Sequence, residues 1–286
     1  MLRTEHVEQA DPSAQTAPLI ERLRGRRFAV LTGAGVSTES GIPDYRSPES
    51  AARERRPIHG PEFVRSAALR KRYWARAMAG WERFRLARPG PSHVALAQLE
   101  DRGLVSGLVT QNVDRLHHAA GSRHVIELHG ALAEVICLDC SVLEGRDAVQ
   151  ARMSEENPGW LGGPSPMAPD GDAELADSAI EMFVVPVCVQ CGGVLKPNVV
   201  FFGHNVSKPI VDAAYDTVAR ADALVVAGTS LAVFSGYRFL LRAAELSIPI
   251  FIVNRGPVRG EERAELKLEA STGEILARMA SELTPA

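Results

Sequence analysis

The sequence is short of lysine and has no long apolar run, and the second of these absences excludes one class of function. Of its 32 basic residues only four are lysine, an arginine bias that we attribute to the source genome. No stretch approaches the roughly 18 uninterrupted apolar residues of a membrane-spanning helix, so we expect no membrane association. The formal net charge of −3 argues against a polybasic surface, so we expect no nucleic-acid binding either.

Cysteine is also scarce, and all four cysteines fall into two Cys-x-x-Cys pairs. The N-terminal segment lacks the apolar stretch of a secretory signal, and its acidic residues are unusual for a transit peptide. We therefore expect a cytoplasmic protein, monomeric by default, in a reducing compartment where such pairs indicate a metal rather than disulfides. Two pairs supply four thiolates for a closed tetrahedral site, whereas a thioredoxin-like redox site needs only one. The sequence predicts one structural Zn²⁺ on Cys137, Cys140, Cys188 and Cys191.

Composition and periodicity predict an α/β protein. Apolar residues make up 45% of the 286 residues and charged residues 23%, as in ordinary globular proteins. Short apolar runs without polar alternation predict strands that are covered on both faces, at Phe28–Thr32, Val105–Thr110, Val125–Leu128, Val199–Phe202, Ala223–Ala227 and Ile248–Val253. Helices are predicted between them, at Ala14–Leu23, Pro61–Arg85, Pro91–Asp101, Val113–Ala120, Pro209–Arg220, Ser235–Leu246 and Gly273–Leu283. This alternation favours a doubly wound, Rossmann-like parallel sheet.

Two segments interrupt the alternation. Residues 48–90 are arginine-rich and mostly helical in pattern, and residues 131–195 carry both cysteine pairs around a Gly/Pro-rich stretch. We expect these two segments to form a smaller, discontinuous zinc-binding lobe. Residues 14–47, 91–130 and 196–286 would then form the large Rossmann-like lobe.

A glycine-rich turn follows the first predicted core strand. Gly33-Ala34-Gly35 would let backbone N–H groups approach a phosphate at the N-terminus of the next helix, although an ordinary tight turn also fits. The next residues present Asp44, Tyr45 and Arg46 in succession, without helical periodicity. This is typical of a loop that displays side chains.

These motifs, taken in chain order, resemble those of the sirtuins, the NAD-dependent protein-lysine deacylases. The matching segments are GAGVSTESGIPDYRS (33–47), TQNVD (110–114), ELHG (127–130), the two cysteine pairs, KPNVVFFG (196–203), GTSL (228–231) and VN (253–254). Within the family, RYWAR (72–76) and SGYRF (235–239) are similar to the class II, sirtuin-four-like branch, here in a protein we expect to be bacterial.

The resemblance implies that the enzyme cleaves NAD to nicotinamide and transfers the acyl group of a protein lysine to ADP-ribose. His129 would be the general base, acting through the ribose hydroxyls, rather than an ordinary histidine at a strand end. Asn112 would orient the ribose and a water, and Asp114 with Val113 would hold the nicotinamide carboxamide; an N-cap pair for the next helix is the alternative. The cofactor-binding residues would be Gly33, Ala34, Gly35, Ser37, Asp44, Tyr45, Arg46, Gln111, Asn112, Val113, Asp114, His129, Gly228, Thr229, Ser230, Asn254, Arg255, Gly256 and Thr272.

The resemblance also places the substrate, an acyl-lysine on another protein. Residues 199–203 would pair with the substrate backbone, with Val200 and Phe202 lining the acyl-lysine tunnel and Gly203 beside them. The family usually has an acid at His204, which leaves the peptide preference open. Tyr73-x-x-Arg76 repeats the spacing that binds an acyl carboxylate in desuccinylating sirtuins, and a solvated arginine on a basic helix is the alternative.

Three other functions are alternatives to deacylation. Protein mono-ADP-ribosyl transfer would use the same NAD cleavage with a different acceptor. A dehydrogenase fits less well, because the turn lacks the third glycine of GxGxxG and no clear ribose-binding acid follows. A non-enzymatic zinc-ribbon adaptor would leave His129 and Asn112 without a role.

Overall fold

The predicted apolar runs form the core of one parallel sheet. The computed structural model describes residues 5–7, 12–45, 58–160 and 180–284. Seven strands pair in parallel in the order β1-β10-β9-β8-β2-β3-β4. Their bounds are β1 Glu5–Val7, β2 Phe28–Thr32, β3 Val105–Thr110, β4 Val125–Glu127, β8 Ala223–Ala227, β9 Ile250–Val253 and β10 Leu266–Leu268. The predicted doubly wound α/β class is confirmed.

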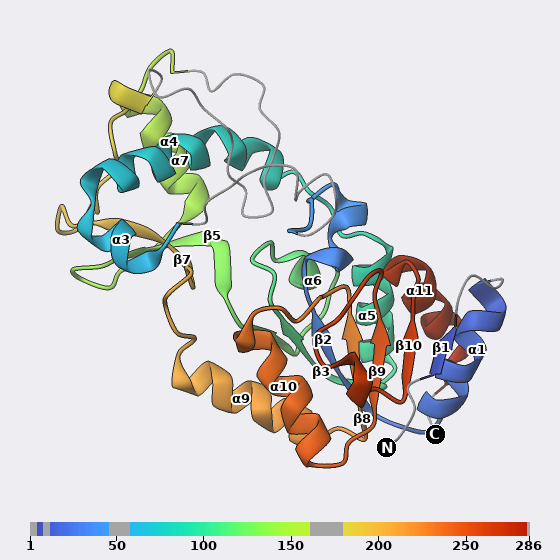
Figure 1. Cartoon of the computed structure of the whole chain (residues 1–286). Coiled ribbons are helices and arrows are strands. Elements are labelled where there is room, and N and C mark those ends of the chain that lie inside the picture. Colours follow the sequence, from blue (N-terminus) through green and yellow to red (C-terminus); the bar gives the residue numbers. More distant parts are fainter. Residues whose placement is uncertain (1–4, 8–11, 46–57, 161–179, 285–286) are drawn as a thin grey trace.

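Helices cover both faces of the sheet, as Figure 1 shows. Alternate residues of β2, β8 and β9 pack into the clusters on opposite faces, which is why these strands, except for Thr32, are apolar at every position. One face packs against α1 (Pro12–Leu23), α5 (Pro91–Asp101) and α11 (Thr272–Glu282). The other packs against α9 (Lys208–Ala219) and α10 (Phe234–Glu245).

A second, smaller lobe lies beside one edge of the large one (Figure 1). It contains an antiparallel sheet of order β6-β5-β7, with β5 at Gly130–Cys137, β6 at Leu143–Gly145 and β7 at Leu195–Val199. Its helices are α3 (Gly60–Arg65), α4 (Ala67–Phe84) and α7 (Arg146–Glu156). A separate apolar cluster unites Phe63, Trp74, Val135, Met153 and Leu195. The small lobe therefore has its own core, built from distant chain segments.

Three predicted elements were wrong in extent or place. The run Val199–Phe202 is not a core strand: only Val199 is in a strand, and that strand belongs to the small antiparallel sheet. The predicted helix Pro61–Arg85 is broken at Ser66, whose extended backbone and side chain cap α4 by accepting from the Leu69 N–H. The helix predicted from Val113 is shortened to α6 (Leu116–Ala119).

The chain order of the large sheet creates a switch point between β2 and β8. The chain runs from β2 outward through β3 and β4, and later returns to β8 on the other side of β2. In doubly wound folds a ligand binds where the order reverses, at the carboxyl ends of the strands. The loops after Thr32, Thr110 and Ala227 meet at this edge.

Among the described residues, no helix is both long and apolar enough to cross a lipid bilayer.

Candidate active site

The glycine-rich turn and the loop after β8 are packed against each other without side chains between them. An ideal Cβ on Gly35 would lie 2.8 Å from the Gly228 Cα, and one on Gly33 would lie 2.6 Å from the Thr229 Cβ. Gly228 has a φ of +60°, and its own Cβ would lie 2.6 Å from the Val36 nitrogen. The expected helix after the turn is replaced by two short 3₁₀ turns, at Ala34–Val36 and Thr38–Ser40.

Ser37 is the centre of a hydrogen-bond network that joins this turn to the loop after β3. Its hydroxyl donates to Asp114 Oδ2 over 2.7 Å and accepts from Asn112 Nδ2 over 2.9 Å. The same Asn112 amide also donates to the Gly33 carbonyl. The second Asp114 oxygen accepts from the Leu116 N–H at the start of α6, so Asp114 supports this helix end as well as the site. Within the described part of the chain the Asn112 side chain bonds only Gly33 and Ser37, so the two residues do not form an N-cap pair. Asn112 and Asp114 are therefore fixed relative to the glycine turn.

Two buried histidines lie next to this network, one against Ser37 and the other against the first. His93 Nδ1 accepts from the Gly90 N–H, so a neutral ring carries its proton on Nε2, which lies 3.4 Å from the Ser37 hydroxyl. The His117 ring lies 4.8 Å from that of His93, and its Nε2 is 3.0 Å from Thr32 Oγ1. Burial lowers the pKa of both imidazoles, that of His117 well below its ordinary value. This layer is therefore uncharged at neutral pH.

His129 lies between β4 and β5, directly before Gly130, with each ring nitrogen in a defined role. Nδ1 donates to the Gln111 carbonyl over 2.9 Å, so in the neutral ring Nε2 is the acceptor. Nε2 is 2.9 Å from the Ser235 hydroxyl at the start of α10. Burial lowers the pKa of His129, and the Gln111 hydrogen bond opposes this effect. A neutral imidazole with an exchangeable partner on Nε2 is what a general base requires.

Gln111 connects His129 to the loop after β8. Its side-chain amide donates to Thr229 Oγ1 over 2.9 Å and to the Thr32 carbonyl over 3.2 Å. An ideal Cβ on Gly236 would lie 2.4 Å from Gln111 Oε1, so α10 approaches this amide closely. The loops after β2, β3, β4 and β8 thus form one connected site.

The remaining predicted cofactor residues lie around this site in less connected positions. Asp44 and Ser230 are half-buried, whereas Tyr45 is 53% exposed. Val113 packs at the junction between the lobes. Arg46 lies outside the described residues.

The residues predicted to contact the adenosine part of NAD bond mainly to neighbouring residues of the loop after β9. The Asn254 side chain donates to the carbonyls of Arg255 and Gly256. The Gly256 N–H donates to Glu269, which also pairs with buried Lys267. Thr272 is buried, and its hydroxyl bonds the Ser92 hydroxyl between α11 and α5, so it is not brought to the site by its side chain.

The predicted peptide-binding segment runs between the two lobes. The Val200 N–H donates to the His129 carbonyl over 2.9 Å, and the Phe202 carbonyl accepts from the Gly60 N–H. Val200 is half-buried, whereas Phe202 is 46% exposed, with Gly203 exposed next to it. His204 packs against Gly60, where a Cβ would lie within 2.5 Å of the imidazole.

Tyr73 and Arg76, the predicted carboxylate-binding pair, lie on the buried side of α4. The Tyr73 ring is 6% exposed and packs edge-on against Phe63 and Phe201, 5.5 and 5.6 Å away. Arg76 is half-buried, and its Nε has no hydrogen-bond partner among the described residues. Arg76 therefore has one buried nitrogen, while the side chain as a whole is neither fully buried nor fully solvated.

The four cysteines meet in one cluster at the end of the small lobe. Their sulfur atoms all lie within 4.8 Å of one another, with separations of 3.5 Å for Cys137–Cys191 and 3.7 Å for Cys140–Cys188. A tetrahedral ion with Zn–S bonds of about 2.3 Å needs S···S separations of about 3.8 Å. Backbone N–H groups, that of Cys140 foremost, lower the pKa of the Cys137 thiol to about 7. The cluster fits a structural Zn²⁺, with all four positions filled by the protein.

Known proteins share this architecture and these motifs. The Sir2 family model matches residues 33–235. The human NAD-dependent protein lipoamidase sirtuin-4, mitochondrial, is 50% identical over 254 residues, which cover 88% of this chain and 81% of the relative. The NAD-dependent protein deacetylase 1 of Mycobacterium avium is 48% identical over 277 residues, 95% of this chain and 97% of the relative. A solved structure of Sir2 with a p53 peptide and NAD⁺ superposes with a TM-score of 0.76 at 30% identity, covering 93% of this chain and 97% of that one.

The chain therefore belongs to the Sir2 family. It is an NAD-dependent protein deacylase, similar to the sirtuin-4-like class II sirtuins and to bacterial deacetylases at about half of all positions. The family, the enzyme class and the use of NAD predicted from the sequence are confirmed.

Sequence reasoning missed the partners that hold the site residues. His129 contacts Ser235, which is 106 residues away in the chain. Ser37 contacts His93 across 56 residues, and His117 contacts Thr32 across 85. The only signal for Ser235 was its place in a segment that resembles the class II branch. Such partners cannot be read from spacing, because the fold alone brings them together.

Proposed function

We propose that this deacylase acts on acyl-lysine side chains of proteins, with His129 as the general base. The observation that carries the proposal is the neutral His129, whose Nε2 faces the Ser235 hydroxyl at the carboxyl edge of the sheet. The acyl oxygen of the substrate would attack the ribose carbon as the bond to nicotinamide breaks. His129 would then remove a proton from the ribose hydroxyls, so that the 2′-hydroxyl attacks the acyl carbon.

The other site residues would orient NAD. The Asp114 carboxylate is held by Ser37 and by the Leu116 N–H, with Asn112 fixed beside it. We assign the nicotinamide carboxamide to Asp114 and Val113, and the ribose to Asn112. The phosphates would lie beside Gly33–Gly35 and Gly228–Thr229, whose backbones pack directly against each other. The N–H groups of Gly33, Gly35 and Gly228 themselves donate to backbone carbonyls within the fold.

A panel of acyl-lysine peptides incubated with NAD and read by mass spectrometry tests the proposal. The expected products are free lysine, nicotinamide and acyl-ADP-ribose in equal amounts. Transfer of ADP-ribose to the peptide or to an added protein, without loss of the acyl group, would instead assign mono-ADP-ribosyl transfer. Solved Sir2 structures with acetylated peptide support the first outcome.

The activity should depend on pH through His129. Burial lowers its pKa, and the base works in its neutral form, so kcat/KM should fall only as the pH drops below the ordinary imidazole value of about 6.5. Profiles of kcat/KM between pH 5 and 8 measure this acid limb. A midpoint above pH 7 would contradict the role of a buried neutral base.

We further propose that Arg76 recognises a carboxylate at the end of the acyl chain. Tyr73, three residues before it, contacts Phe201 in the segment that would line the tunnel, and a carboxylate would satisfy the unpartnered Arg76 Nε. Arg76→Met should therefore reduce kcat/KM on succinyl- or glutaryl-lysine about 10- to 100-fold more than on acetyl-lysine. Arg72→Met, which changes an exposed arginine of the same helix, is the control. Equal losses on both substrates would show that Arg76 only supports the fold.

A further inference from the structure

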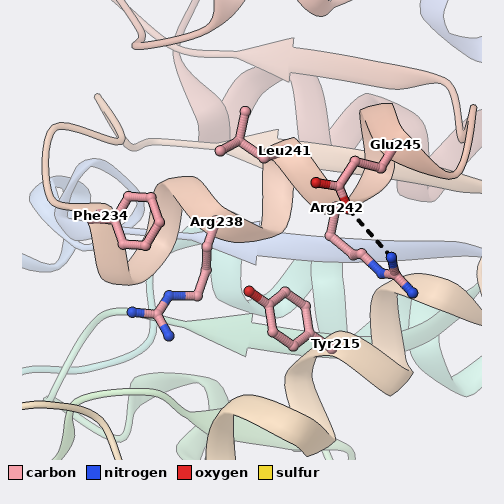
Figure 2. Close-up of a pocket in the computed structure, with 6 residues that line it drawn as sticks. All are labelled: Tyr215, Phe234, Arg238, Leu241, Arg242 and Glu245. Atoms are coloured by element: carbon pink, nitrogen blue, oxygen red, sulfur yellow. Dashed lines mark hydrogen bonds and ion pairs between the residues drawn. The ribbon is translucent and has the colours of Figure 1, made fainter.

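A groove on the outer face of the large lobe lies between α9 and α10. It has a volume of about 350 Å³ and is lined by Tyr215, Phe234, Arg238, Leu241, Arg242 and Glu245. Figure 2 shows the Tyr215 ring of α9 between the two arginines, which lie on successive turns of α10. The groove therefore combines aromatic surface with positive charge.

The two arginines differ in how far their charge is neutralised. Arg242 pairs with Glu245 over 3.3 Å, on the same helix. Arg238 makes no ion pair or hydrogen bond with the described residues, and its Nε is buried without a partner. Its guanidinium lies 5.1 Å from the centre of the Phe234 ring, which is itself 55% exposed. A half-buried, uncompensated arginine against an aromatic ring is complementary to a carboxylate.

The groove begins at Phe234, the residue before Ser235 in the first turn of α10. Ser235, which bonds His129 Nε2, precedes Arg238 by three residues on α10, a rise of about 4.5 Å. The Val200 N–H donates to the His129 carbonyl from the segment that runs between the two lobes. A lysine that reaches His129 Nε2 would therefore pass close to Ser235, in the first turn of α10. Because an extended chain advances by about 3.3 Å per residue, one of the nearest flanking residues of an extended substrate would come within reach of Arg238.

We propose that this groove is a specificity subsite for an acidic side chain that flanks the acyl-lysine. The carboxylate pairs with Arg238, and the methylene groups of a glutamate pack on Tyr215 and Phe234. This inference rests on the proposed action on acyl-lysine proteins. It gives a basis for choosing among substrates in an enzyme whose net charge of −3 offers no general attraction to acidic proteins.

Peptides that differ in one flanking residue test the subsite. Acyl-lysine peptides carry glutamate, glutamine or lysine at the second or third position on either side. On one side the glutamate peptide should show a KM about three- to tenfold below that of its glutamine partner, the range between an exposed and a half-buried ion pair. Arg238→Glu should reverse this order in favour of the lysine peptide, with the glutamine peptide turned over as before. Arg238→Gln should abolish the preference without reversing it.

The matched control is Arg220→Glu, the same charge change on an exposed side chain at the end of α9. Its preference should equal that of the wild type. An effect of Arg220→Glu as large as that of Arg238→Glu would assign the preference to the overall field and overturn the subsite. Equal KM values for all flanking residues in the wild type would also overturn it. Turnover of the glutamine peptide reports separately on the proposed function, because that peptide makes no use of Arg238.

Discussion

Replacing His129 with alanine should lower the rate of deacylation by about 10²- to 10⁴-fold, the contribution typical of a positioned general base. Exchange of labelled nicotinamide into NAD should persist, because the acyl oxygen attacks the ribose without help from a base. The proton must leave only when the 2′-hydroxyl attacks. Single-turnover deacylation and nicotinamide exchange, measured on the same enzyme, separate the two steps.

His118→Ala is the matched control for this substitution. His118 lies on α6 with a side chain that is 41% exposed, and it faces Glu127 over 3.7 Å rather than the site. It should leave both rates unchanged. If His129→Ala deacylates as fast as the control, the base lies elsewhere; if it loses exchange as completely as deacylation, His129 is needed to bind NAD rather than to move a proton.

The core of the fold could be predicted because its strands are buried on both faces. β2, β3 and β8 have the predicted bounds, since burial on both sides selects mostly apolar residues without polar alternation. β10 was missed because Lys267 interrupts its pattern. In the structure this lysine is 2% exposed and pairs with Glu261 and Glu269, over 2.7 and 2.5 Å. Both glutamates lie outside the strand, so the strand's own residues do not show that the lysine charge is neutralised.

The run Val199–Phe202 shows why an apolar segment alone does not define a sheet strand. Val199 packs at the junction of the lobes, Val200 packs against α9 and α10, and Phe201 packs in the core of the small lobe. The segment is apolar because it passes three different cores in succession. Periodicity cannot distinguish this arrangement from a strand covered on both faces.

The candidate site was predicted mainly by motif resemblance, and the structure supplies the physical connections. Asn112 and Asp114 remain outside a helix because Arg115 has a φ of +60° and α6 begins only at Leu116. The displayed loop is thus a consequence of local backbone geometry. Ser37 holds Asn112 and Asp114 in place, and His93 lies against Ser37. These contacts join segments that are far apart in the chain, so the sequence pattern does not predict them.

Loss of one cysteine ligand should have the largest effect on stability. Cys140→Ser should lose the bound Zn²⁺ and unfold the small lobe, because Cys137 and Cys188 are themselves part of its apolar cluster. Apparent binding free energies of structural zinc are about 10–16 kcal/mol in small zinc modules. This equals or exceeds the whole stability of a typical domain, about 5–15 kcal/mol.

The damage should reach the active site although no cysteine touches it. β5 begins at Gly130, the residue after His129, and ends at the zinc ligand Cys137. Leu132 of the same strand packs with Ile42 and Trp81 between the lobes. Unfolding of the small lobe therefore removes one wall of the site, and deacylation should fall with zinc content.

Tryptophan fluorescence can follow this unfolding selectively, because all three tryptophans lie in the small lobe: Trp74, Trp81 and Trp160. Their emission should shift to the red in Cys140→Ser, while far-ultraviolet circular dichroism retains the signal of the large sheet and its helices. Cys140→His keeps a ligand that zinc accepts beside three thiolates and should restore both metal content and emission in part. A Cys140→Ser protein with one bound zinc per chain and wild-type emission would contradict the structural role, since the ion would then be held without its fourth thiolate.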